Sequence, residues 1–367
     1  MRNFFLLLSL ILFWSCQSSH KPLDLSLAER IVPENPDAYI RGGRNLHAAE
    51  LNAYDDSSII VINGGQVLRY HVFDNTLSKI HIPDQIYSRV KKAGIHQDLL
   101  VLPPQPEQYI PHESHSCIDF QKVDTVTYMY GVMRLASYEK WRGQMMGVIG
   151  KFFFVARGLV QQDSFYVDTF DILEKFDADF VTNEFHVQQN DIYVPVLNHE
   201  SRTATKYFKY QFGSDEGQLF KDTVLESSLC PNVAKNRNYK KRYPTYTWKD
   251  DGDRLLRSNP DFIFSSAGDT LFKRPSYLDR HAIQSFSIIG PSALAIRVFC
   301  KKDLDKDTSL SKFRLLVHQP DTTLDIPLDS FHFTTKIIRL PGVDRIGFFA
   351  TKEDDYENIY FVEASWE

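Results

Sequence analysis

Short apolar runs separated by polar turns recur along most of the chain. The run Ile59–Ile62 is followed by the turn Asn63-Gly64-Gly65, after which Val67–Phe73 alternates between apolar and polar residues and Leu77–Ile82 forms a third run. Side chains alternate between the two faces of a strand, and Asn-Gly is a common sequence in tight hairpin turns. The pattern therefore predicts antiparallel strands joined by short turns.

The same pattern returns along the chain, with hairpins starting near residues 59, 99, 151, 191, 261, 294 and 345. The intervals range from 33 to 70 residues, with a mean of about 48. Repeats of about 40–50 residues that contain several short strands are typical of β-propeller blades. We therefore predict an all-β fold, a β-propeller with six blades; seven blades also fit the spacing. A pair of β-sandwiches, divided near residues 180–190 or 225–250, is the alternative.

A helical pattern is short wherever it occurs. The best candidate is Gln85–His96, which is interrupted by Gly94. Elsewhere the sequence has no long apolar stripe with a period of 3.6 residues, which is the signature of an amphipathic helix. This favours β structure for the rest of the chain.

The first residues have the features of a secretory signal. Arg2 precedes the apolar run Phe4–Trp14, which is shorter than the roughly 20 residues that a membrane-spanning helix needs. Ser15 and Cys16 follow, and then a polar stretch. A small residue followed by Cys after such a run resembles the lipobox of bacterial lipoproteins, in the looser form found in Bacteroidota. We expect residues 1–15 to be a lipoprotein signal peptide and Cys16 to be lipidated; an ordinary signal peptide with an incidental cysteine is the alternative.

The polar residues 16–45, which contain Pro22, Pro33 and Pro36, are expected to form a tether, although part of this range also suits a strand. Residues 46–367 are expected to form the propeller domain. This layout resembles Bacteroidota lipoproteins with a six-bladed, TolB-like β-propeller. The resemblance implies a protein of the cell envelope, held on the outer membrane by acyl chains such as palmitate, and it brings no agreed set of catalytic residues.

Composition narrows the classes of partner. The chain has 42 Lys and Arg against 47 Asp and Glu, a formal net charge of −5. Nucleic-acid-binding domains are usually basic, so no nucleic acid is expected as a partner. Aromatic residues make up 13% of the chain, which suits β structure.

The most unusual segment interleaves cations with aromatic residues between residues 235 and 248. We interpret this segment as a charged loop that connects two blades. The alternative is a binding site for an acidic glycan, a peptide or an anionic lipid head group, because aromatic rings stack on sugar rings and cations pair with carboxylates or sulfates. The candidate ligand-binding residues are Arg237, Tyr239, Lys240, Lys241, Arg242, Tyr243, Tyr246 and Trp248.

Other polar segments lack the spacing of known sites. His112–Cys117 brings too few ligands together for a structural zinc site and follows Pro111, so we interpret it as a polar loop. Asp303–Asp307 resembles the start of an EF-hand calcium loop, but the next residue is Thr308, where that loop needs glycine. Cys117, Cys230 and Cys300 suit buried apolar positions, with one disulfide as the alternative. We predict no metal, cofactor or catalytic residue from these segments.

The sequence thus favours a non-catalytic, lipid-anchored propeller that binds a protein or glycan. The first alternative is a propeller enzyme acting on glycans or lactones, with its site at the central channel. The second is a structural subunit of an envelope complex. Sequence spacing does not show which His or carboxylate side chains meet at the channel.

Overall fold

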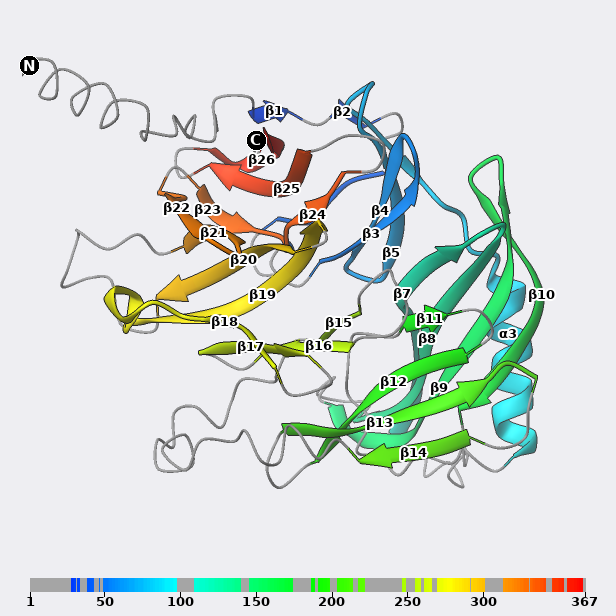
Figure 1. The fold of residues 1–367 in the computed structure, drawn as a ribbon. Coiled ribbons are helices and arrows are strands. Elements are labelled where there is room, and N and C mark those ends of the chain that lie inside the picture. The colour runs from blue at the N-terminus through cyan, green and yellow to red at the C-terminus, as the bar shows by residue number, and fades with distance from the viewer. Residues whose placement is uncertain are drawn as a thin grey trace, which may run out of the picture.

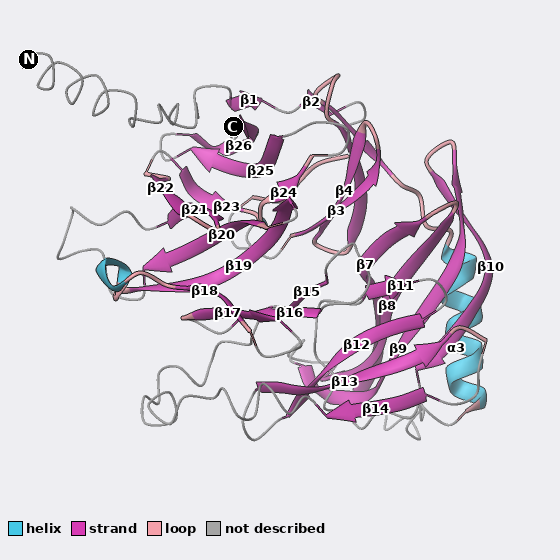
Figure 2. Cartoon of the chain, viewed as in Figure 1, coloured by secondary structure: helices cyan, strands magenta, loops and turns pink. Residues whose placement is uncertain are grey.

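The computed structural model of the chain describes residues 28–30, 32–33, 38–42, 46, 49–97, 109–139, 145–173, 186–188, 191–198, 203–213, 217–221, 246–248, 255–258, 261–265, 269–290, 292–300, 313–329, 331–340, 345–352 and 355–365. These residues confirm the prediction of an all-β fold, because strands dominate them and the only helix of more than one turn among them is α3 (Asp84–His96) (Figure 2).

The described strands form six small sheets, which we number from the N-terminus. Sheet 1 contains, in spatial order, β2 (Val32–Pro33), β6 (Thr76–Lys79), β5 (Gln66–His71), β4 (Ser58–Asn63) and β3 (Glu50–Asp55). Sheet 2 contains β10 (Ser164–Leu173), β9 (Met145–Gln161), β8 (Val126–Glu139) and β7 (Tyr109–Val123). Sheet 3 contains β11 (His186–Gln188), β12 (Asp191–Asn198), β13 (Thr203–Gln211) and β14 (Gly217–Lys221).

The second half of the chain repeats this plan. Sheet 4 contains β15 (Tyr246–Trp248), β16 (Leu255–Ser258), β17 (Phe262–Ser265) and β18 (Thr270–Lys273), which the short 3-10 helix η2 (Ser276–Leu278) follows. Sheet 5 contains β19 (His281–Gly290), β20 (Ala293–Cys300), β21 (Phe313–Gln319) and β22 (Thr322–Pro327). Sheet 6 contains β1 (Ala28–Arg30), β26 (Asp355–Ser365), β25 (Arg345–Lys352) and β23 (Phe331–Thr334), with β24 (Ile338–Arg339) also paired to β25.

The sheets follow one another around a common centre, which is the arrangement of a β-propeller (Figure 1). Several contacts between neighbouring sheets join one strand of each: β3 contacts β7, β7 contacts β11, β15 contacts β19, β19 contacts β24, and β24 contacts β3. We call this set of strands the inner edge of the ring.

The continuous apolar run in β4 shows why the sheets stack face to face. All its residues are buried, and its four apolar residues alternate between two core clusters. Ile60 and Ile62 pack against sheet 2, whereas Ile59 and Val61 pack against sheet 6. A strand that is covered on both faces loses the polar alternation of a half-exposed strand.

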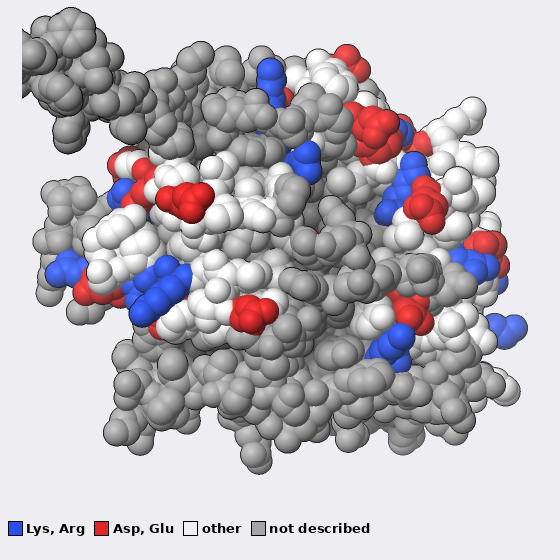
Figure 3. All heavy atoms as spheres, viewed as in Figure 1, with Lys and Arg blue, Asp and Glu red and all other residues white. Residues whose placement is uncertain are grey.

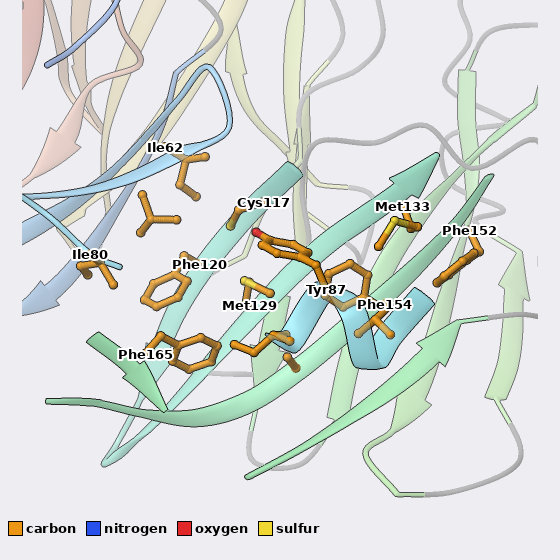
Figure 4. Packing of buried hydrophobic residues seen from close by; sticks show 14 of the residues in the cluster. Ile62, Ile80, Tyr87, Cys117, Phe120, Met129, Met133, Phe152, Phe154 and Phe165 are labelled. Carbon is orange, nitrogen blue, oxygen red and sulfur yellow. The ribbon is translucent and has the colours of Figure 1, made fainter. Parts of the chain in front are cut away.

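Sheet 2 is the largest sheet, and its strands are longer than those of its neighbours. Strand β9 has 17 residues, whereas β4 has 6. Sheet 1 therefore covers only part of one face of sheet 2, and α3 packs on the same core cluster with Ile86, Tyr87 and Val90 (Figure 4). Each fully buried aromatic ring such as Phe154 stabilises the fold by about 1.5–3 kcal/mol.

Most predicted strands are confirmed, including β4, β12 and β25, as is the helix Gln85–His96. Two predictions were wrong. The polar segment His112–Cys117, interpreted as a loop, lies in β7, because each of its residues has a register partner in the neighbouring strand β8. The runs Ser164–Val167 and Ile172–Phe176, which the repeat pattern predicts as two strands, are joined as far as residue 173 in the continuous strand β10, which has only a register shift between Val167 and Thr169.

The N-terminal segment belongs partly to the folded domain. Residues 16–45 were expected to form a tether of which part also suits a strand, and β1 pairs with β26 and β2 pairs with β6. Consecutive short strands thus join sheet 6 to sheet 1, the last sheet to the first. The backbone bonds of β1 shield the edge of β26, which explains why these residues join the sheet.

Candidate functional site

The structure places only some of the residues that the sequence singled out. Tyr246 and Trp248 lie in β15, the first strand of sheet 4, and Tyr246 pairs with Arg257. Cys16, Cys230 and the Asp303–Asp307 segment lie outside the described residues, as do Arg237, Tyr239, Lys240, Lys241, Arg242 and Tyr243. Cys117 and Cys300 are buried thiols, as the sequence predicted.

A group of charged and amide side chains that the sequence did not single out meets at and beside the inner edge of the ring. We call it the inner-edge cluster: Glu50 and Asn52 on β3, Asp119 on β7, Arg297 on β20, and Lys336 between β23 and β24. Glu50 and Asn52 share one face of β3, while Leu51 between them packs into the core. The alternation in β3 therefore presents polar side chains to the neighbouring sheets.

Asp119 is the centre of this cluster. Its Oδ1 atom accepts hydrogen bonds from Asn52 Nδ2 at 2.5 Å and from the backbone nitrogen of Phe120 at 2.7 Å. Its Oδ2 atom accepts one from Gln121 Nε2 at 2.9 Å. The strand register shifts between Cys117 and Asp119, and such bulges change the direction of nearby side chains.

Burial is the main cause that raises the pKa of Asp119 to about 6, and the charge of Glu50 raises it further. Lys336 and the hydrogen bonds from Asn52 and Phe120 oppose this increase. Asp119 is only 4% exposed, so water screens these charges weakly.

Two further contacts connect the cluster to sheet 6. Lys336 forms an ion pair with Glu50, which joins sheet 6 to sheet 1. The guanidinium of Arg297 donates through Nη1 to the carbonyl oxygens of Thr334 and Thr335, and to Thr334 Oγ1 at 3.2 Å. Burial lowers the pKa of Arg297 to about 9, and the charge of Glu50 opposes this decrease. Arg297 therefore stays charged at neutral pH.

Sheet 3 joins the ring through a neutral contact. The backbone nitrogen of Val187 in β11 donates to Gln121 Oε1 at 3.3 Å. Burial lowers the pKa of the neighbouring His186 to about 4, so its imidazole is neutral at pH 7.

Cys117 Sγ donates to the carbonyl oxygen of Asp119 at 3.3 Å, and burial raises the pKa of this thiol well above its ordinary value. A thiol in that state is a poor nucleophile.

The inner-edge cluster has balanced charges and holds the sheets together. Two carboxylates, Glu50 and Asp119, stand with two cations, Lys336 and Arg297, across sheets 1, 2, 5 and 6. A general base needs a lone pair directed at its substrate. Both oxygens of Asp119 already accept hydrogen bonds from protein donors, and Glu50 is paired with Lys336.

The surface of the described residues shows no large area of one charge on the face drawn in Figure 3, where acidic and basic side chains alternate. Within the same described ranges, no helix is long and apolar enough to cross a membrane. No three His, Cys, Asp or Glu side chains gather there as a potential metal site.

Comparisons with solved structures find propellers and other proteins at low identity. A luciferin-regenerating enzyme aligns over 89% of this chain and 95% of its own at 8% identity, with a TM-score of 0.45. The β-propeller domain of the trilobed protease from Pyrococcus furiosus aligns over 90% and 97% at 8% identity, with a TM-score of 0.38. The extracellular domain of a putative one-component system from B. thetaiotaomicron aligns over 92% and 40% at 10% identity, with a TM-score of 0.40.

No family model matches the chain, and no curated protein matches it in sequence.

Proposed function

We propose that this chain is a lipid-anchored β-propeller of the bacterial cell envelope, with each of the six sheets as one blade, that binds an envelope protein or glycan. The observation that carries the proposal is the state of the inner-edge cluster. Its described carboxylates bind other protein groups across the sheets, so they rigidify the ring. A rigid ring with loops at its rim suits a binding module.

The anchor in this proposal is Cys16, and outer-membrane attachment through its acyl chains follows from the lipobox resemblance. The test is labelling of growing cells with an alkyne analogue of palmitate, followed by membrane fractionation. Wild-type protein should take up label and sediment with membranes, whereas Cys16→Ala should do neither. Ser18→Ala, two residues beyond the lipobox, is the matched control and should behave as wild type. Label in the Cys16→Ala variant would refute lipidation at this residue.

The ligand contact in this proposal is the segment of cations and aromatics that ends at Tyr246 and Trp248 in β15. A carboxylated glycan such as polygalacturonate should co-sediment with the full chain, and neutral dextran should not. Charge reversal of Lys240, Lys241 and Arg242 to Glu should abolish this binding. The matched control reverses three exposed lysines outside the segment, Lys79 in β6, Lys92 in α3 and Lys273 in β18, for the same change in net charge. Equal loss in both variants would show non-specific attraction and refute the site.

An enzyme acting on glycans or lactones is the second candidate, because Asp119 has a pKa of about 6 beside the charge of Glu50. Two carboxylates of this kind serve glycoside hydrolysis when their separation suits the substrate. The test measures lactone or glycan hydrolysis by wild type, Asp119→Asn and Glu50→Gln. Turnover that both substitutions abolish, with the fold retained, would replace the binding proposal. Turnover that persists in both variants would show that Asp119 and Glu50 are not the catalytic carboxylates.

A further inference from the structure

Arg297 is a buried cation whose hydrogen bonds, among the described residues, are all with neutral groups. Its side chain is only 3% exposed, and Nη1 donates to the carbonyl oxygens of Thr334 and Thr335 and to Thr334 Oγ1. Among the described residues no carboxylate lies within 4.0 Å of its nitrogens, and Glu50, whose charge favours the guanidinium, is paired with Lys336. Buried charges in proteins are normally paired, because an isolated ion loses its hydration.

A second buried donor lies directly opposite. Ser285 on β19 is the register partner of Arg297 on β20, so both side chains lie on the same face of sheet 5. Ser285 is 5% exposed. Within the described part of the chain, Ser285 Oγ and Arg297 Nε both lack a hydrogen-bond partner.

This face of sheet 5 is turned toward sheet 6. Ser287, two residues after Ser285, donates from Oγ to the carbonyl oxygen of Ile337. Arg297 reaches Thr334 and Thr335 in the same segment. The two unpartnered donors therefore lie at the boundary of sheets 5 and 6, beside the ion pair of Lys336 and Glu50.

Two buried donors at one place suit a single acceptor that both share. A carboxylate has two oxygens in one plane, so one oxygen can accept from Arg297 Nε while the other accepts from Ser285 Oγ. Hydrogen bonds between a guanidinium and a carboxylate are also stronger than those between neutral groups. We propose that Arg297 Nε and Ser285 Oγ form a binding site for a small carboxylate anion between sheets 5 and 6.

The low exposure of both residues limits the ligand to a group the size of acetate, either free or at the end of a larger molecule. Lys336 is the partly exposed cation beside the site, with 22% of its side chain accessible, and it offers an approach for an anion. The inference goes beyond the proposed function, and it needs neither the lipid anchor nor the segment ending at Trp248.

The test measures thermal unfolding of the full chain, purified in detergent, while acetate replaces chloride at constant ionic strength. Acetate should raise the melting temperature in a saturable way, because a ligand that binds only the folded state stabilises it. Ser285→Ala should weaken the apparent affinity for acetate about tenfold, the value of one hydrogen bond to a charged group. Arg297→Met should remove the effect.

Ser78→Ala is the matched control, because Ser78 is also a buried serine whose hydroxyl lacks a partner among the described residues, but it lies in sheet 1. It should keep the full response to acetate. If Arg297→Met does not fold, the comparison of the two serine variants still decides the question. Equal responses to acetate, chloride and phosphate would show a general salt effect and overturn the site. A melting temperature that does not change with acetate would mean that the two donors bind water, and would also overturn it.

Discussion

The side-chain amide of Asn52 on β3 donates to the carboxylate of Asp119 on β7 at 2.5 Å, and to the carbonyl oxygen of Phe120 at 3.1 Å. One amide nitrogen thus joins sheet 1 to sheet 2 at the inner edge of the ring. Asp119 is buried, so water has little access to its carboxylate oxygens if the Asn52 donor is removed.

Replacement of Asn52 by Ala should lower the free energy of unfolding by about 2 kcal/mol, the typical cost of leaving a buried acceptor without its donor. Urea unfolding followed by circular dichroism measures this change. Gln85→Ala, at an exposed position of α3, is the control and should change the free energy by less than about 0.5 kcal/mol. Equal effects of the two substitutions would show that the Asn52 contact contributes little.

The stability of the protein should depend on pH through Asp119. Its pKa rises from 3.8 to about 6 on folding, mainly because of burial and then because of Glu50. A carboxyl group with a raised pKa favours the folded state when protonated, so its contribution is present below pH 4 and is lost as the pH rises through 6. Relative to Asp119→Asn, which does not titrate, wild type should lose about 3 kcal/mol of stability between pH 4 and pH 7.

Urea unfolding of both proteins at a series of pH values gives this difference and cancels groups that titrate in both, such as Asp55. Glu50→Gln keeps Asp119 but removes one of the charges that raise its pKa. The loss of stability between pH 4 and pH 7 should therefore be smaller in Glu50→Gln than in wild type. A difference between wild type and Asp119→Asn that stays constant with pH would contradict the assignment.

Gly94 in α3 should tolerate no larger residue. A Cβ atom at this position would lie 2.4 Å from Cε1 and 2.6 Å from Cζ of Phe152 in β9. Gly-to-Ala changes in a helix normally stabilise it by about 1 kcal/mol, but overpacking here should reverse the sign and cost about 1–3 kcal/mol. The melting temperature of Gly94→Ala measures this effect.

A second substitution checks the cause of that loss. Phe152→Leu replaces the ring with a smaller side chain and makes room for a Cβ atom at position 94. The double variant Gly94→Ala/Phe152→Leu should therefore be more stable than the sum of the two single effects predicts. Lys92→Ala, exposed on the same helix, should leave the melting temperature almost unchanged. A stabilised Gly94→Ala variant would show that α3 lies further from β9.

The turn between β9 and β10 should accept a stabilising change. Gln162 and Asp163 both have positive φ values, 48° and 56°, which are unusual for residues other than Gly, Asn and Asp. Two such residues form the tight turn that suits twisted strands, where Asn is favoured. Gln162→Asn should raise the free energy of unfolding by about 0.5 kcal/mol. Gln161→Asn, in the adjoining strand, should have no such effect, and equal changes would contradict the turn assignment.

Several elements were predictable from local sequence. The run Ile59–Ile62 with the turn at Gly64 predicts its hairpin, because a buried strand needs continuous apolar residues and Gly64 has a positive φ of 59°. The helix ending at His96 follows from its apolar spacing. The long strands β7 and β8 were not predicted, since Pro111 and polar side chains such as Ser114 and Ser116 resemble a loop until a neighbouring strand provides their hydrogen bonds.

The inner-edge cluster was not predictable from sequence. Asn52 and Asp119 are 67 residues apart, and no local motif links them. The sequence alone determined the all-β class and the hairpin repeat, because strand alternation and turn conformation depend on near neighbours. Only the tertiary structure decided that β1 closes onto β26 and that Ser285 lies beside a buried Arg297 at the boundary of two sheets. These relationships depend on how the sheets pack around the ring, and the burial that changes the pKa of Asp119 exists only in the folded protein.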